Sequence, residues 1–148
     1  MGIGGIGHVH SVAEWGGVAK LRNHYYATID SSVIDQYGHM NYKAYPALFE
    51  PAQDEFMDSR GIGFVAIETR FGLRSVVKLM QVTCHGELLA GDSVDIATFA
   101  KAGTTSITYV QIAMKSDAVA AEMKLVVVLV DKDGKPTPVP DEIREKIR

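Results

Sequence analysis

The sequence predicts one α+β domain in which a long helix is followed by a run of antiparallel strands. Two observations carry this prediction. Apolar residues recur at three- and four-residue spacing over residues 42–60, and four stretches rich in β-branched and aromatic residues follow from residue 74 onward. A chain of 148 residues is long enough to bury one sizeable core. We expect residues 23–148 to form this domain and residues 1–22, which are glycine-rich at first, to be a flexible extension.

A first strand is expected within residues 24–34, where aromatic and β-branched residues gather. Asn41 is placed to cap the start of the helix that follows. Pro46 fits the first turn of that helix, whereas Pro51 predicts a kink or a break because proline removes a helical hydrogen bond. The apolar face of the helix is expected to hold Tyr45, Leu48, Phe49, Ala52 and Phe56.

Turn signals rich in glycine and aspartate separate four further strands, expected at residues 74–85, 93–101, 105–115 and 119–130. The residues expected to give one face of the sheet to the core are Val76, Leu79, Val94, Ile96, Val110, Ile112, Leu125, Val127 and Leu129. The helix at 42–60 is the only predicted element able to cover that face. A sheet of this kind leaves an edge, and the very apolar segment Lys124–Val130 suits exposure on both faces poorly, so we expect a dimer.

After the last strand, Pro140 begins a short predicted helix, with Ile143 and Ile147 expected to pack on the outside of the sheet.

The composition excludes several classes of partner. A net charge of -3 with 22% charged residues lacks the basic excess of nucleic-acid-binding proteins. The longest apolar run, residues 125–130, is too short to cross a bilayer, and no export signal is visible. The single cysteine, Cys84, lies in an alternating apolar stretch, so we expect a buried strand residue and a reducing cytoplasm.

The run Asp35-Gln-Tyr-Gly38-His39-Met-Asn41-Tyr42-Lys-Ala-Tyr45 is the most informative part of the chain. It sets a carboxylate just before a glycine turn and the expected start of a helix. Helix starts carry unpaired N–H groups and the positive end of the helix dipole, which polarise a carbonyl oxygen resting there. Because Asp35 is close enough to attack that carbonyl or to activate water, the run predicts acyl chemistry.

This run, the following Phe49-Glu50 and the downstream strands resemble the acyl-CoA thioesterases of the 4-hydroxybenzoyl-CoA thioesterase type, over roughly residues 25–148. The resemblance implies the hotdog fold, in which a curved antiparallel sheet of about five strands wraps one long helix. It also implies hydrolysis of an acyl-CoA to a free acid and coenzyme A without a metal or redox cofactor. In this family the active sites lie at the interface of a homodimer, and two dimers often form a tetramer.

By the same resemblance, Asp35 matches the catalytic carboxylate and the backbone N–H of Tyr42 matches the donor to the thioester oxygen. From the residues alone, Asp35 is equally an ordinary turn residue or helix cap. Gly38 permits a tight turn and a close approach to the acyl group. His39 and Asn41 are expected to fix the loop by hydrogen bonds rather than to transfer protons.

Tyr45 is expected to pack in the core, with contact to the acyl chain as its second role. Glu50 is a rival catalytic group, because a second branch of hotdog thioesterases uses an acidic residue on this helix after a His-Gly-Gly motif, which this chain lacks. Together with Lys43, Gln53 and Asp54, Glu50 is more simply interpreted as solvated or as an interface position able to serve a neighbouring subunit's site.

Other substrate contacts are predicted by residue type only. The depth of the acyl pocket depends on the packing of Phe49, Phe56, Phe64 and Phe71. The cations that suit coenzyme A phosphates are Arg70, Arg74, Lys78, Lys101 and Lys115, although scattered solubilising charge explains each of them as well. The spacing of His8, His10, His24 and His85 makes no convincing metal set.

Two other functions stay open at this stage. One is a non-catalytic module that binds acyl-CoA or an acyl carrier, although such a module has no need of a carboxylate near the thioester. The other is a hotdog hydratase or dehydratase, which pairs an aspartate with a histidine. Asp35 and His39 have a similar spacing, but their setting with Gly38 and Asn41 fits the thioesterases.

Overall fold

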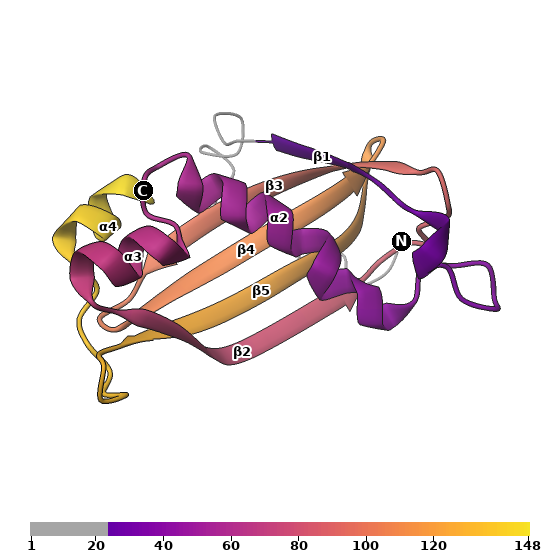
Figure 1. Cartoon of the computed structure of the whole chain (residues 1–148). Helices are drawn as coiled ribbons and strands as arrows, with labels where there is room; N and C mark the ends of the chain where they lie inside the picture. The colour runs from indigo at the N-terminus through magenta and orange to yellow at the C-terminus, as the bar shows by residue number, and fades with distance from the viewer. Residues whose placement is uncertain (1–23) are drawn as a thin grey trace.

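The structure, a computed structural model, describes residues 24–148, so the expected extension at residues 1–22 lies outside the described residues, as do His8 and His10. Five strands form one antiparallel sheet in the order β1-β3-β4-β5-β2. Figure 1 shows this sheet curving around helix α2, which lies across its concave face. The predicted α+β hotdog arrangement is therefore confirmed. The elements are β1 (His24–Thr28), η1 (Ser31–Val33), η2 (Tyr42–Ala44), α2 (Tyr45–Asp58), α3 (Phe64–Phe71), β2 (Arg74–Cys84), β3 (Ser93–Ala102), β4 (Ser106–Lys115), β5 (Ala118–Val130) and α4 (Asp141–Lys146).

The main core lies between α2 and the sheet. Phe49 and Phe56 of α2 are fully buried in it, and truncating either to alanine typically costs about 3–5 kcal/mol. A buried polar contact fixes the middle of the helix over the sheet: Gln111 Nε2 donates to the Phe49 carbonyl at 2.9 Å and to Thr98 Oγ1 at 3.1 Å. The position of α2 is therefore set by both apolar packing and hydrogen bonding.

The long helix starts later than predicted and does not break. Residues 42–44 form the 3₁₀ turn η2, which Asn41 caps by accepting the Lys43 N–H on its side chain at 2.9 Å. Helix α2 then runs through Pro51 to Asp58, so the expectation of a break is wrong. Pro51 is exposed, and water can therefore satisfy the carbonyl that loses its partner.

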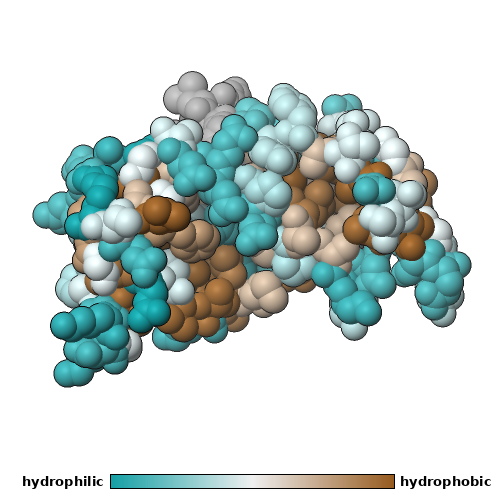
Figure 2. Space-filling model, in the orientation of Figure 1, coloured by the Kyte–Doolittle hydropathy of each residue, from teal (hydrophilic) through white to brown (hydrophobic). Residues whose placement is uncertain are grey.

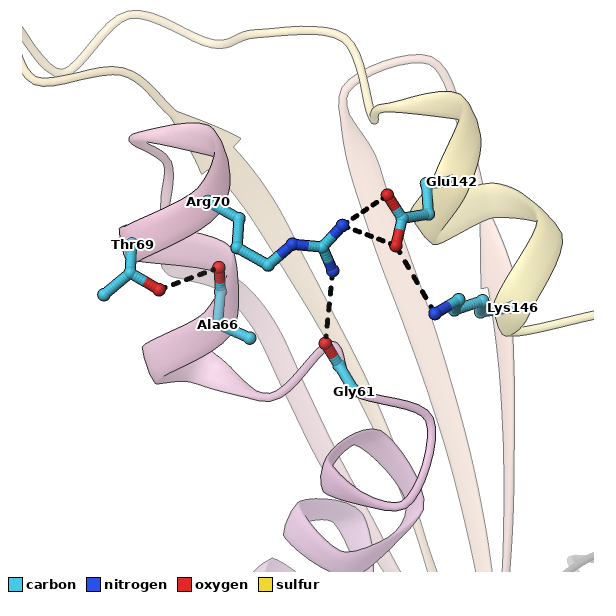
Figure 3. A network of polar contacts seen from close by, with 6 residues as sticks. All are labelled: Gly61, Ala66, Thr69, Arg70, Glu142 and Lys146. Atoms are coloured by element: carbon cyan, nitrogen blue, oxygen red, sulfur yellow. Dashed lines mark hydrogen bonds and ion pairs between the residues drawn. The ribbon is translucent and has the colours of Figure 1, made fainter.

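Helix α3 was not predicted, and it closes one end of the core together with α4. Arg70 on α3 binds the Glu142 carboxylate on α4 with its Nη2, at 2.5 and 2.7 Å, and Lys146 lies 3.4 Å from the same group (Figure 3). The bond to Arg70 is the main reason that the pKa of Glu142 lies below its ordinary value. Ile143 and Ile147 belong to the main core, so their predicted place outside the sheet is wrong.

The two faces of β4 are reversed relative to the prediction. Ile107 and Tyr109 face the main core, whereas Val110 and Ile112 form a second cluster with Phe99. Both faces of this strand are apolar, so alternation could not tell them apart.

The exposed apolar edge of the sheet is β2, not β5. Strand β5 is paired on both sides, so the prediction that its apolar segment needs a partner chain is wrong. The side chains of β2 are instead 42–58% exposed at Val76, Val77, Leu79 and Met80. Figure 2 shows apolar surface gathered along this strand, below α2. Cys84, expected to be buried, is exposed at the end of β2.

No helix within residues 24–148 is long and apolar enough to span a membrane.

Candidate active site

Asp35 lies in a tight turn at the end of the sheet where α2 begins. Its backbone N–H donates to the His39 carbonyl at 2.9 Å, and its carbonyl accepts the Gly38 N–H at 3.0 Å. One carboxylate oxygen, Oδ1, accepts the backbone N–H groups of Tyr37 at 2.9 Å and His39 at 3.4 Å. The other oxygen, Oδ2, accepts no hydrogen bond from the described residues. Hydrogen bonds to one oxygen thus hold the carboxylate in place, and the other oxygen is available to a substrate or to water.

The chain contains the same turn a second time, at the end of β5. Asp131 N–H donates to the Lys135 carbonyl at 2.9 Å, and Asp131 Oδ1 accepts the N–H groups of Asp133 at 2.8 Å and Lys135 at 3.0 Å. Gly134 has a φ of +81°, as Gly38 has a φ of +86° in the first turn. The hydrogen bonds of Asp35 are therefore ordinary turn chemistry, and any special role must come from what surrounds the first turn.

The surroundings of the Asp35 turn differ in that a helix start follows it. Tyr42 is the first residue of η2, so its N–H has no acceptor within that turn. Asn41 fixes the junction, because its N–H donates to the Val33 carbonyl at 2.8 Å and its side chain caps η2. The Tyr42 ring is 77% exposed. An unpaired N–H therefore lies beside the turn that holds the Asp35 carboxylate.

A second loop, residues 85–92, holds the Asp35 turn in place. His39 Nε2 lies 2.8 Å from the Glu87 carboxylate, and the Met40 N–H donates to the Leu88 carbonyl at 2.8 Å. Glu87 was not predicted as a site residue, because no local pattern connects it to a turn so distant in the chain. The imidazole of His39 is directed to Glu87, which supports its predicted role in fixing the loop.

Tyr45 is buried beneath the helix start, as its predicted packing role requires. Burial, followed by contact with the Cys84 thiol, raises the pKa of Tyr45 to about 12, so its phenol stays protonated at neutral pH. This contact places the end of β2 next to the first turn of α2, and hence next to the candidate site.

A groove runs from the first turn of α2 along the helix, between α2 and strands β2 and β5. Its cavity volume is about 320 Å³, within the range of small-molecule sites. Glu50, which is exposed, lines it, and so does Phe64 at the start of α3. Of the four phenylalanines expected to shape a pocket, Phe64 alone lines this groove. We call it the α2–β2 groove; its lining residues are Pro46, Ala47, Glu50, Gln53, Phe64, Ser75, Val77, Met80, Met123, Leu125 and Val127.

The sequence interpretation missed the polar residue at the inner end of this groove. Gln53 was predicted to be solvated or at an interface, but it is only 5% exposed. It faces the sheet because it follows Pro46 and Ala47 along the groove side of α2.

The five cations proposed for coenzyme A phosphates are not gathered in one place, and Lys78 lies exposed on the β2 edge, next to the groove-lining Val77. Arg70 is bonded to Glu142 at the far end of α2, and Arg74 and Lys101 lie at that same end of the sheet. Lys115 lies at the end of β4 nearest the Asp35 turn, where it pairs with Asp92 at 2.7 Å. Within residues 24–148 no group of three or more histidine, cysteine, aspartate or glutamate residues is placed to hold a metal ion.

Solved structures of similar fold include several thioesterases. A 1,4-dihydroxy-2-naphthoyl-CoA thioesterase from Synechocystis matches with a TM-score of 0.75 and 12% identity, covering 84% of this chain and 93% of that one. A gentisyl-coenzyme A thioesterase matches with a TM-score of 0.74 and 17% identity, covering 85% and 100%. A hypothetical protein from Staphylococcus aureus, solved in complex with CoA, matches with a TM-score of 0.75 and 17% identity, covering 85% and 82%. At these identities the likeness establishes the fold.

The sequence itself identifies the family. A search of curated proteins finds no match. The profile of the thioesterase-like superfamily, in contrast, matches residues 31–147, from the turn before Asp35 to the end of the last helix. Because this match spans most of the chain, the protein belongs to the thioesterase-like superfamily.

Proposed function

We propose that residues 23–148 form one acyl-CoA thioesterase domain that hydrolyses a thioester to a free carboxylic acid and coenzyme A. The observation that supports this most strongly is the geometry of Asp35. One oxygen of its carboxylate is fixed by two backbone N–H groups and the other is available, and the helix start with the unpaired N–H of Tyr42 follows the same turn. The groove of about 320 Å³ begins at the following helical turn and offers space for an acyl group.

In the proposed reaction the thioester carbonyl oxygen rests on the Tyr42 N–H, which stabilises the oxyanion that forms. Losing one such donor typically costs about 3 kcal/mol of transition-state stabilisation. Asp35 either attacks the carbonyl carbon or takes a proton from an attacking water. In the first route the coenzyme A thiolate leaves and water hydrolyses the resulting mixed anhydride; in the second, water supplies the new oxygen directly. Both routes consume one water and need no cofactor.

The remaining predicted site residues have supporting roles in this proposal. Gly38 and Asn41 set the path of the backbone between the carboxylate and the N–H donor. His39 fixes the turn through Glu87. Tyr45 supports the helix start from below, and Glu50 lies at the side of the groove where it contacts the substrate. A hydratase would need the His39 ring near Asp35, but that ring is directed to Glu87.

The proposed enzyme is a homodimer, formed by pairing of the exposed β2 edges. Four apolar side chains on one long edge strand favour contact with another chain over exposure to water. Val77 and Met80 on this strand also line the α2–β2 groove, so a partner strand at this edge would border the site. A single cysteine fits a cytoplasmic location, because disulfides are rare in that compartment.

The direct test of the function is release of free thiol from a panel of short, long and aromatic acyl-CoA substrates. Hydrolysis of any of them supports the proposal. If none is hydrolysed but acyl-CoA still binds, the protein is a non-catalytic acyl-CoA binding module instead.

The repeated turn gives a matched test of Gly38. Gly38→Ala and Gly134→Ala place a Cβ at φ values of +86° and +81°, which typically costs about 1–2 kcal/mol at either position. We expect similar losses of stability in urea unfolding, but a loss of thiol release only for Gly38→Ala, because only that turn carries the proposed catalytic carboxylate. Equal thiol release by both variants would contradict the role of the Asp35 turn.

A further inference from the structure

A second, smaller chamber lies directly behind the α2–β2 groove. Gln53 and Phe64 line both spaces, so the groove and the chamber adjoin at these two residues. The inner chamber has room for about one water molecule, at about 10 Å³. Its other lining residues are Asp54, Met57, Ile62, Gly63, Ile67 and Tyr109.

Two buried polar side chains of this chamber have no hydrogen-bond partner among the described residues. Gln53 is 5% exposed and Tyr109 is 3% exposed, and neither side chain makes a hydrogen bond within residues 24–148. Their polar atoms are not among the fully buried side-chain atoms that lack a partner, so a group the size of water can reach them. Two polar side chains that line one space in this way can offer hydrogen bonds to a ligand group or to water.

The charges around the chamber indicate which ligand group fits. Burial, and then the charges of Glu50 and Asp58, raise the pKa of Asp54 above its ordinary value. Burial and the nearby Asp54 carboxyl also raise the pKa of Tyr109, so its phenol stays neutral. A carboxylate entering the chamber would therefore meet like charge. A hydroxyl group suits the site better, because it can donate to Asp54 or to the Gln53 carbonyl oxygen and accept from the Gln53 amide or the Tyr109 phenol.

The distance between the helix start and Gln53 determines how long the acyl group must be to reach the chamber. Gln53 lies eight residues after Tyr45, so α2 rises about 12 Å between them. A short acyl group or one with a single ring, whose thioester rests at the Tyr42 N–H, would end within the groove. Only an elongated acyl group would reach Gln53 and Phe64, where the groove and the chamber adjoin.

We propose that the inner chamber recognises the far end of the acyl group, and that the preferred substrates are elongated acyl-CoA thioesters bearing a terminal hydroxyl. This specificity rests on the proposed thioesterase function. Gln53 and Tyr109 are the specificity-determining residues, and neither takes part in the chemical step.

The test compares decanoyl-CoA with ω-hydroxydecanoyl-CoA by kcat/KM for thiol release. We expect wild type to prefer the hydroxylated substrate by about tenfold, the gain from one good hydrogen bond in a buried site. Tyr109→Phe together with Gln53→Leu removes the polar atoms with little change of volume, so the ratio should fall to about one while decanoyl-CoA is hydrolysed at least as fast. Tyr26→Phe, on the exposed face of β1, is the matched control and should keep the wild-type ratio.

The outcomes separate this proposal from the function on which it rests. Two results would overturn the proposal while leaving the thioesterase function intact. One is an equal kcat/KM for the two substrates in wild type. The other is a preference for the hydroxylated substrate that survives in the double variant. If neither substrate is hydrolysed, the thioesterase function fails. The dissociation constants of the same two thioesters then test the recognition of the hydroxyl group, and equal affinities overturn the proposal as well. Stronger preference for ω-aminodecanoyl-CoA would show that the chamber recognises positive charge, which also contradicts it.

Discussion

Replacing Asp35 with asparagine is expected to lower thiol release at least about a hundredfold, the lower end of what a positioned acid, base or nucleophile contributes. Asparagine keeps an oxygen that accepts the N–H groups of Tyr37 and His39, so the turn should persist. What disappears is the negative charge and the free carboxylate oxygen. The variant should therefore unfold at nearly the wild-type temperature while losing activity.

The matched control is Asp131→Asn. Asp131 makes the same set of turn hydrogen bonds as Asp35, but at the end of β5, away from the helix start. Any effect of weakening such a turn should appear equally in both variants. If Asp35→Asn proves as active as Asp131→Asn, then Asp35 is a turn residue only and the proposed mechanism is wrong.

The two turns also show how far local sequence can predict a site. Both have the pattern Asp-x-x-Gly, and both fold into the same hydrogen-bonded turn because aspartate side chains and glycine backbones favour it locally. The sequence identified the first turn as functional because Asn41 and a helix start follow it. The resemblance to a known family strengthened that interpretation. The part played by Glu87 depends on a contact across the fold, which no local pattern encodes.

Contacts between distant segments, which local sequence does not encode, also explain the wrong predictions about the fold. The bounds of the last four strands match the prediction to within one residue, because glycine and aspartate turns mark them. The first strand, expected within residues 24–34, already ends at Thr28. The order of the strands depends on pairing between distant segments, so the sequence could not show that β5, whose apolar segment led us to expect a dimer, is paired on both sides within the chain. Helix α3 buries only Ile67 fully and follows two glycines, so its apolar pattern was too weak to recognise.

The burial of Gln53 is the clearest example of a feature that local sequence did not predict. It stands among acidic residues on α2, which is typical of a solvated face, and its burial arises from a chamber completed by Tyr109 on β4. Only the packing of two distant elements reveals that this amide is enclosed. The residues that we expect to set substrate choice were thus the least predictable, whereas the turn that we expect to carry the chemistry was the most predictable.

The second large effect is expected from substitutions in the exposed β2 edge, which should prevent dimer formation. Val76 and Leu79 are 52% and 42% exposed, and neither lines the α2–β2 groove. In a symmetric dimer formed by pairing two β2 edges, residues near the two-fold axis face their own copies, so a lysine placed there meets another lysine. We expect the double variant Val76→Lys with Leu79→Lys to convert the dimer to a monomer in sedimentation velocity, with a fall in thiol release because the partner strand no longer borders the groove.

The opposite edge of the sheet provides the control. Tyr26 on β1 is 74% exposed, and Tyr26→Lys adds a similar charge to the other edge strand. This variant should sediment as the wild-type dimer, because the five-residue edge of β1 presents few groups for pairing. A wild-type protein that sediments as a monomer, or a β2 double variant that remains dimeric, would show that β2 is not the interface. If the wild-type protein is a monomer, the groove must be complete within one chain, and Asp35 would act on a substrate held by that chain alone.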